Sequence, residues 1–289
     1  MTAPQVAPRG AFRWVLWAGA AAVLLFFYAP IIVLVVFSFS DSDTVGTWGG
    51  FTTRWYSAFA DNDDVQDALG VSLRVAFVST LVSVVLGTMS ALALERFEFR
   101  GKRVFDGLLY LPIIVPDVTM AVSMLLFFSK GLQALDDWFG LEWQKGVSTV
   151  IVSHIAFNIS FVSVVVRARL SGMDTTLEQA ASDLYASRWR TFRHVTFPQI
   201  VPGIAGGALL AFTLSLDDVV ITQFALGPGA TTLPVWVFGV VRRGVTPLVN
   251  AVSVVMLAAS MALVLLSVLA QRRSANSGRG SSSRPVESH

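Results

Sequence analysis

Three aspartates stand inside stretches of chain that are otherwise apolar, and their type and position make them the strongest candidates for chemistry: Asp117, Asp217 and Asp218. A carboxylate surrounded by hydrocarbon is costly, so each of these side chains should face the protein interior or water. Intramembrane acids are by default candidates for a functional site, and separated carboxylates suit a solute with separated positive charges. We therefore expect Asp117, Asp217 and Asp218 to line a pathway for a cation.

A structural role is the alternative for each acid. Asp117 could pair with Arg74, or bind backbone groups that the nearby prolines Pro112 and Pro116 leave free. Adjacent helical residues point about 100° apart, so one residue of the Asp217–Asp218 pair can face a pathway while the other packs or caps a helix. At 1.5 Å per residue, Asp117 should lie roughly 15 Å from the cytoplasmic end of its span, near the membrane midplane.

His154 and Asn158 form the other polar pair in an apolar stretch. They are four residues apart and share one face of a helix. Contacts between helices are the expected use of such a pair, and lining of a pathway is the alternative. No second histidine or carboxylate stands at ligand spacing, so we predict neither a metal site nor catalytic residues.

The elements that position these residues are membrane spans. The chain is 54% hydrophobic and 14% charged, which is too apolar for an ordinary soluble domain. Nearly charge-free runs of about 20 residues can each cross the hydrocarbon as a helix. The sequence predicts an all-α integral membrane protein with six transmembrane helices: Trp14 to about Phe39, Gly70 to Leu94, Gly107 to Phe128, Val147 to Val166, Ile200 to Phe224, and Leu248 to Ala270.

The prolines and glycines between Val219 and Val241 cut that apolar stretch into pieces too short to span, so we expect a short helix in its latter half. We expect a cytoplasmic segment at residues 1–13, a transmembrane domain at 14–270 and a disordered cytoplasmic tail at 271–289. The chain has no cysteine, which excludes disulfides and thiolate chemistry.

The basic residues predict the orientation. Six spans with a cytoplasmic N-terminus leave six basic residues outside: Arg54, Arg74, Lys130, Lys145, Arg242 and Arg243. The other 15 of the 21 lie inside, as the positive-inside rule expects. Both termini and the loop between spans four and five, at about residues 170–199, are then cytoplasmic.

That loop carries a recognisable segment. Its residues are Glu178, Gln179, Ala180, Ala181, Ser182, Asp183, Leu184 and Tyr185, followed by Pro198. They resemble the EAA loop of ABC-transporter permeases of the binding-protein-dependent import class, whose pattern is Glu-Ala-Ala followed by a glycine and a Leu-Pro. Gln179 occupies the position of the acid and Tyr185 that of the turn glycine, so the turn must be made without glycine's freedom of φ.

Other segments resemble the spermidine/putrescine permease subunits of that family. They begin at Tyr28-Ala29-Pro30, Phe51-Thr52-Thr53, Phe97-Glu98-Phe99, Pro116-Asp117, Phe212-Thr213-Leu214, Gly227-Pro228-Gly229, and Pro247 with Asn250-Ala251. The resemblance implies a permease similar to those of type I ABC importers, in the cytoplasmic membrane of a prokaryote. It also implies that residues 178–181 and 183–185 of the loop contact an ATPase dimer, with a second permease chain, an extracytoplasmic binding protein and a polyamine substrate.

The chain lacks Gly-x-x-x-x-Gly-Lys-Ser/Thr, the loop that cradles phosphates in an ATPase. We expect ATP and Mg²⁺ to be bound by the partner ATPase, with no cofactor in this chain and no nucleic-acid partner. Two alternatives remain open. The permease could carry another small cationic or polar solute, or the chain could be a self-contained carrier that uses the three aspartates as a proton or cation relay.

Overall fold

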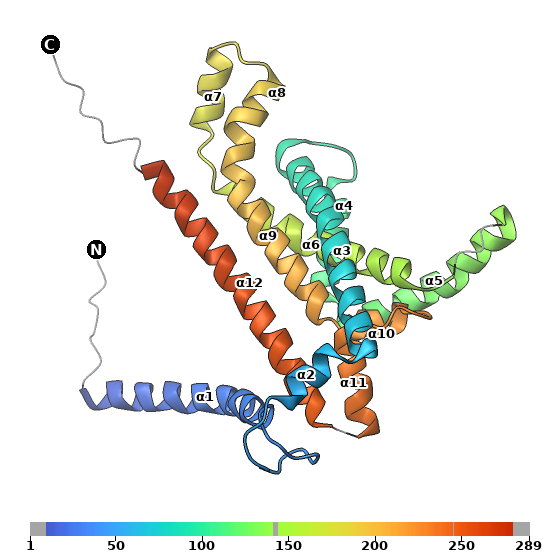
Figure 1. The fold of residues 1–289 in the computed structure, drawn as a ribbon. Helices are drawn as coiled ribbons and strands as arrows, with labels where there is room; N and C mark the ends of the chain where they lie inside the picture. Colours follow the sequence, from blue (N-terminus) through green and yellow to red (C-terminus); the bar gives the residue numbers. More distant parts are fainter. Residues whose placement is uncertain (1–9, 141–143, 245, 280–289) are drawn as a thin grey trace. The chain divides into compact units, whose positions relative to one another are not determined.

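The backbone is helical almost throughout. The computed structural model describes residues 10–140, 144–244 and 246–279, and these residues form twelve α-helices and one π-helical turn (Figure 1). Within them the only β pairing is an isolated antiparallel bridge between Ser40 and Phe51. The predicted all-α class is confirmed.

The chain divides into two compact units, the smaller of which comprises Met1–Asn62 and Val240–Leu257. Its first helix, α1, spans Gly10–Phe37, and a loop leads from it to α2, Arg54–Ala60. The Ser40–Phe51 bridge closes this loop, and the ring of Phe39 stacks on that of Phe51 at 5.5 Å between centroids. The unit also contains the beginning of α12, which spans Pro247–Arg279.

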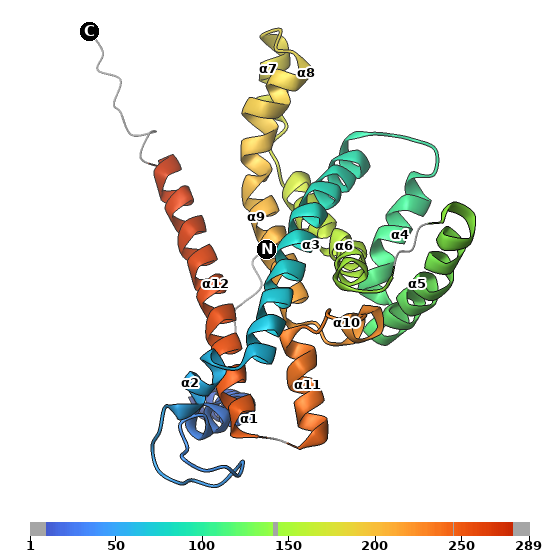
Figure 2. The same ribbon diagram turned by 45° about the vertical axis from the view of Figure 1, so that its right-hand side comes forward.

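The larger unit is built around three packed helices, α3 (Asp63–Arg96), α6 (Val147–Ser171) and α9 (Phe197–Asp217) (Figure 2). Their contact contains a cluster of buried apolar residues: Ala91, Val162, Val166, Leu170, Ile200 and Ala211. Without water to drive them together, helices in a membrane associate by close packing, and the small side chains in this cluster permit that.

Two glycines bring the three helices into close contact at Val162. A Cβ atom on Gly87 of α3 would lie 2.8 Å from the Cβ of Val162, which is closer than side chains pack. A Cβ on Gly207 of α9 would lie 3.3 Å from Cγ1 of the same valine. Val162 on α6 therefore fits between two helices because both lack a side chain where they meet it.

The remaining elements of the larger unit connect and cover these helices. They are α4 (Lys102–Ile114), α5 (Asp117–Phe139), α7 (Thr176–Asp183), α8 (Arg188–Thr191), the π-helical turn η1 (Phe192–Thr196), α10 (Val220–Ala225), most of α11 (Leu233–Arg243) and the part of α12 from Ala258 onward. Figures 1 and 2 both show α7 and α8 side by side beyond the start of α9.

Six helices are long and apolar enough to cross a membrane, which confirms the predicted number. The stretch Val219 to Val241 forms α10 and α11 rather than a seventh span. Helix α12 continues to Arg279, so residues 271–279 of the predicted tail are helical, and residues 280–289 of that tail lie outside the described residues.

The third predicted span differs in detail. The prediction ran through Gly107 to Phe128, but the helix breaks at Val115, which is extended with ψ 133°, and a new helix begins after Pro116. The ring of a proline disfavours helical geometry in the residue before it, and proline offers no N–H to continue the ladder. The membrane-length helix is therefore Asp117–Trp138, and Asp117 is its first residue rather than a mid-span residue.

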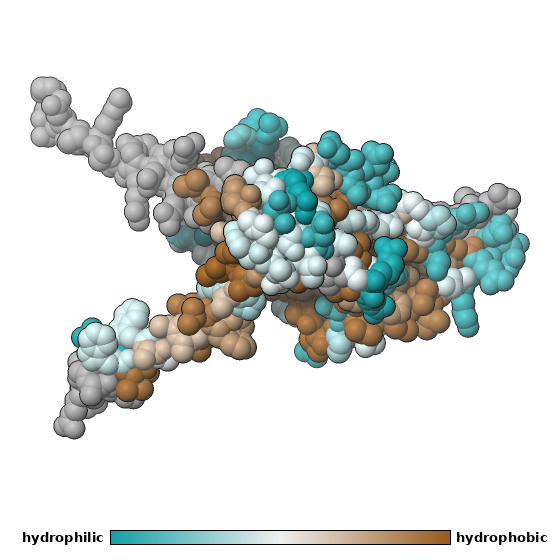
Figure 3. Space-filling model, turned by 60° about the horizontal axis from the view of Figure 1, so that its bottom comes forward, coloured by the Kyte–Doolittle hydropathy of each residue, from teal (hydrophilic) through white to brown (hydrophobic). Residues whose placement is uncertain are grey.

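Large apolar side chains are exposed on many of these helices. Figure 3 shows hydrophobic residues, in brown, across the visible surface. On α1 the side chains of Trp14 and Phe26 are 79% and 76% exposed. Exposed apolar area of this extent marks a lipid or protein contact, in keeping with helices that cross a membrane.

Candidate functional site

Two of the three predicted acids, Asp217 and Asp218, lie at the break between α9 and α10. Helix α9 ends at Asp217, and Asp218 is extended with ψ 131°. The Asp218 carboxylate turns back onto α10, where it accepts hydrogen bonds from the backbone N–H of Thr222 at 2.7 Å and from its hydroxyl at 2.8 Å. Asp218 therefore caps a helix, whereas the side chain of Asp217 is exposed.

Asp218 also belongs to a buried network of hydrogen-bonded side chains, all of which lie within the larger unit. His154 Nε2 lies 2.9 Å from the Thr222 hydroxyl and 3.4 Å from Asp218 Oδ2. The other ring nitrogen, Nδ1, lies 3.0 Å from the hydroxyl of Ser215. Asn158 Nδ2 donates to the same hydroxyl at 2.8 Å. The predicted contact between helices at His154 and Asn158 thus exists, with Ser215 at its centre.

If His154 is neutral, these contacts determine which atoms donate and which accept each hydrogen bond of the network. The Thr222 hydroxyl donates to Asp218, so its oxygen accepts from Nε2–H of His154. Nδ1 is then an acceptor for the Ser215 hydroxyl. The Ser215 oxygen accepts from Asn158 and from the hydroxyl of Ser79, which lies 2.9 Å away on α3. One chain of hydrogen bonds therefore joins α3, α6, α9 and α10.

Asp117 lies at the start of α5, and its side chain is exposed. A carboxylate in the first turn of a helix is favoured by the positive end of the helix dipole. Helix α5 packs against α10, the short helix that follows Asp217 and Asp218. The structure thus places Asp117 and the aspartate pair on neighbouring elements, with Asp117 and Asp217 as the exposed members.

The predicted coupling loop forms α7, and its end has a specific turn. The N–H of Ala186 bonds to the carbonyl of Ala181 at 3.0 Å, and that of Tyr185 bonds to Ser182 at 3.0 Å. This pair of bonds is a Schellman motif, which requires a left-handed residue. Tyr185 supplies it with φ 58°, the only positive φ of a non-glycine residue within the described residues. The turn predicted to lack a glycine is therefore made by a tyrosine in a glycine-like conformation.

The loop has one face that is exposed to solvent, here called the open face, and one that is half-buried. Leu184, Tyr185 and Trp189 are 81%, 97% and 66% exposed, which is unusual for large apolar side chains. Gln179, Ala180 and Asp183 are also exposed, whereas Glu178 and Ala181 are half-buried. The exposed apolar residues of this open face are Leu184, Tyr185 and Trp189.

Glu178 points toward the body of the protein. Its carboxylate forms two hydrogen bonds with the guanidinium of Arg96, both 2.7 Å long, and accepts a third from the hydroxyl of Thr196 at 2.6 Å. Arg96 is the last residue of α3, and Thr196 is the last residue of η1. Glu178 therefore joins α7 to two other elements.

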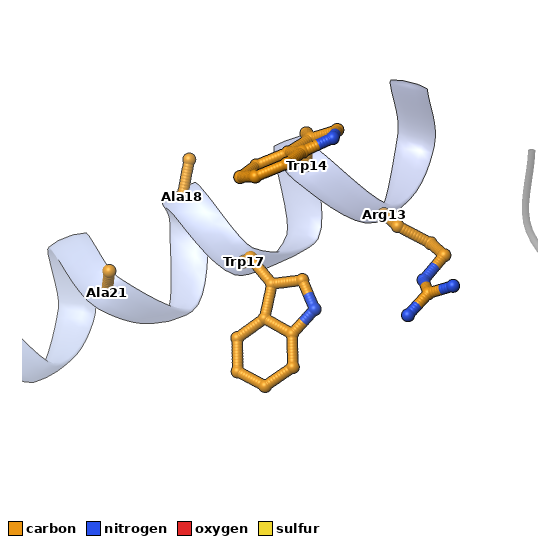
Figure 4. Close-up of a pocket in the computed structure, with 5 residues that line it drawn as sticks. All are labelled: Arg13, Trp14, Trp17, Ala18 and Ala21. Carbon is orange, nitrogen blue, oxygen red and sulfur yellow. The ribbon is translucent and has the colours of Figure 1, made fainter. Parts of the chain in front are cut away.

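A hollow of about 820 Å³ lies against the beginning of α1, lined by Arg13, Trp14, Trp17, Ala18 and Ala21 (Figure 4). All five residues belong to one helix, and Figure 4 shows no convergence of their side chains on a common point. A basic residue with two tryptophans at the end of an apolar helix is typical of the membrane–water interface. We do not assign a solute site to this hollow.

These features define a multi-pass membrane protein: six helices of membrane length, a hydrogen-bonded polar network in its interior and exposed acids at two helix ends. Residues 83–277 match the family model of the binding-protein-dependent transport system inner membrane component. The chain belongs to this family, and it is a multi-pass inner-membrane permease subunit of an ABC importer.

Two curated relatives from Escherichia coli strain K12 are similar over most of the chain. The putrescine transport system permease protein PotI is 42% identical over 81% of this chain and 82% of its own. The spermidine/putrescine transport system permease protein PotC is 38% identical over 87% of this chain and 91% of its own. The resemblance predicted from the sequence is confirmed.

A solved structure shares the fold. A bacterial ABC transporter involved in the import of the acidic polysaccharide alginate matches with a TM-score of 0.74, covering 90% of this chain and 96% of the other. The identity is 19%, so this likeness concerns the fold alone.

Sequence reasoning missed several residues of both sites: Ser79, Arg96, Thr196, Ser215 and Thr222. Hydroxyl residues are common in membrane helices, and one alone carries no signal. The spacing of Ser79 and Ser83, four residues apart on α3, could have indicated a polar helix face, since both bond to neighbouring helices.

Proposed function

We propose that this chain is one of two permease subunits of an ATP-driven importer of polyamines such as putrescine and spermidine. The observation that carries the proposal is similarity over about four-fifths of the chain to two permeases whose names give putrescine and spermidine/putrescine as their solutes. The fold alone does not select a solute, because the alginate transporter has the same fold and an acidic polysaccharide as its cargo.

The exposed acids suit such a solute. Alkyl ammonium groups titrate near pH 10, so a polyamine is a flexible polycation at neutral pH. Asp117 and Asp217 are carboxylates at the ends of two different helices, and both are exposed. We assign them to the pathway, where each would pair with one ammonium group of the solute. Asp218 was predicted as a third pathway residue, and its bonds to α10 favour the capping role.

Partner subunits would bind the nucleotide, complete the pathway and deliver the solute. ATP and Mg²⁺ would be bound by a cytoplasmic ATPase dimer that contacts Leu184, Tyr185 and Trp189 on the open face of the loop. A second permease would complete the pathway, and an extracytoplasmic binding protein would deliver the solute. The charge distribution supports cytoplasmic termini and a cytoplasmic loop. Closure of the ATPase would push α7, and α7 would move the spans.

The test is uptake by the complete complex reconstituted in vesicles. Asp217→Asn and Asp117→Asn should each raise the KM for putrescine about two- to fivefold, because an exposed charge pairing is worth roughly 0.5–1 kcal/mol. Asp67→Asn is the matched control, since Asp67 is an exposed acid on α3. Its KM should not change.

Two results would contradict parts of the proposal. Normal putrescine uptake by both variants would remove these acids from the pathway. Uptake of a neutral solute in preference to putrescine and spermidine by the wild-type complex would overturn the assignment of a polyamine.

A further inference from the structure

In the loop that is proposed to contact the ATPase, the Glu178 carboxylate bonds to residues of two other elements. Glu178 bonds to Arg96 through both carboxylate oxygens and to Thr196 through one of them. Its side chain is 18% exposed and that of Arg96 is 31% exposed, so the pair is partly shielded from water. A bidentate pairing of arginine and carboxylate also fixes the relative orientation of its two partners.

The two partners of Glu178 lead into the helices that form the core. Arg96 ends α3, and Thr196 ends the π-helical turn that runs directly into α9. Farther along their length, α3 and α9 meet again at the hydrogen bond between Ser79 and Ser215. Helix α9 then ends at Asp217. A displacement of α7 therefore acts on both helices at once, and one of them carries an exposed acid at its far end.

The end of α3 is itself fixed to other elements. Glu95 accepts a hydrogen bond from Arg167 of α6 at 3.0 Å, and Arg167 also pairs with Asp106 of α4. Consecutive residues of α3 therefore hold the loop on one side and α6 with α4 on the other. These short, directional links form a contiguous network that connects α7 with α3, α4 and α6.

A second ion pair near the end of α3 has only a local role and serves as a comparison. Lys102 pairs with Glu98 at 2.7 Å, four residues away, and the Glu98 side chain is 89% exposed. That pair joins neighbouring residues across one turn of chain and is open to solvent, so it contributes little. The Glu178–Arg96 pair joins residues 82 positions apart, and the Glu178 carboxylate is far less exposed than that of Glu98.

We propose that Glu178 and Arg96 are the positioning pair through which the coupling loop moves α3 and α9 together. The ATPase would displace α7 through its open face, and the Glu178–Arg96 pair would transmit this displacement to α3 and α9. This inference rests on the proposed function, and it separates two roles within one short helix: Leu184 and Tyr185 bind the ATPase, whereas Glu178 binds the spans.

The test uses the complete complex with Glu178→Gln, Arg96→Gln, the charge exchange Arg96→Glu with Glu178→Arg, and Glu98→Gln as the matched control. The readouts are co-purification of the ATPase and the ratio of putrescine transported to ATP hydrolysed. Each single variant should retain the ATPase and lose on the order of tenfold in that ratio, because one charged partner of a partly shielded pair is removed. The exchange should recover most of the loss, and Glu98→Gln should behave as wild type.

Full coupling in both single variants would overturn the proposal, as would an exchange variant no better than the singles. A second measurement needs no partner: hydrogen exchange of the α7 backbone in the chain alone in micelles. Glu178→Gln should accelerate exchange across residues 176–183 about tenfold over Glu98→Gln, and equal rates would contradict the positioning role. If the wild-type chain retains no ATPase, the proposed function fails while this second measurement still decides the inference.

Discussion

The interior of the α3, α6 and α9 bundle and the face of α7 with α8 are opposite in character. In the bundle, His154, Ser79 and Ser215 are buried and bonded to one another in a network that reaches Asp218. On the α7 face, Leu184 and Tyr185 are almost fully exposed. A soluble protein places these residue types the other way round.

The difference follows from what surrounds each region. Lipid offers no hydrogen bonds, so polar side chains of the spans such as His154, Ser79 and Ser215 lie inside, where they bond to one another. Helix α7 lies outside the membrane-length helices, and we propose that a protein partner covers the apolar side chains exposed at its end. On this proposal the two regions have different roles: the interior fixes the helices relative to one another, and the open face binds the ATPase.

The largest effect is expected from breaking the interior network at its centre. Ser215→Ala removes the common partner of His154, Asn158 and Ser79, so three buried groups each lose a hydrogen bond. The free energy of unfolding in micelles should fall by about 2–4 kcal/mol. Thr213→Val is the control, since the Thr213 hydroxyl bonds only to Leu209 of its own helix. Equal thermal denaturation midpoints for the two variants would show that the network contributes nothing special.

Breaking the open face should affect binding rather than folding. Leu184→Asp places a charge where the ATPase is expected to dock, and the dissociation constant for the ATPase should rise about 10- to 100-fold. The thermal midpoint of the chain alone should not change, because Leu184 is exposed. Arg188→Gln, on the same loop, is the control. Titration of the ATPase onto the chain in nanodiscs measures the effect, and an unaltered dissociation constant would place the docking surface elsewhere.

The close contact in the bundle gives an intermediate effect. Gly87→Ala inserts a methyl group against Val162 and should lower the free energy of unfolding by about 1–3 kcal/mol. Gly70→Ala on the same helix has open space around it and should be neutral or slightly stabilising. Thermal denaturation of both variants checks this pair, and equal midpoints would mean that the close contact with Val162 does not limit the size of residue 87.

The smallest effect is expected at the turn that ends α7, where Tyr185 adopts a left-handed conformation. Tyr185→Gly should stabilise the end of α7 by about 1 kcal/mol, because glycine adopts the left-handed conformation without the strain that a tyrosine carries. Hydrogen exchange of the Ala186 amide, which closes the turn, should slow about fivefold. Tyr185→Ala keeps a Cβ and should bring no such gain, so slower exchange in the alanine variant would indicate another cause.

The sequence was sufficient for the number of spans and the family but not for every span boundary or for the roles of individual polar residues. Apolar length predicts that a span exists, but the predicted third span ran through Pro116, where the structure begins a new helix. The capping role of Asp218 was left open, since it depends on how the chain turns at the end of α9. Glu178 was predicted to contact the ATPase, yet it faces Arg96, a residue 82 positions away. Pairings over such distances depend on tertiary packing, which periodicity does not encode.

Putrescine uptake into vesicles tests the account most directly, with the chain reconstituted either alone or together with its second permease, ATPase and binding protein. The account predicts that accumulation requires all partners and hydrolysable ATP, and that vesicles holding only this chain accumulate none. Accumulation by the chain alone without nucleotide would contradict the claim that it is a permease driven by a partner's ATPase.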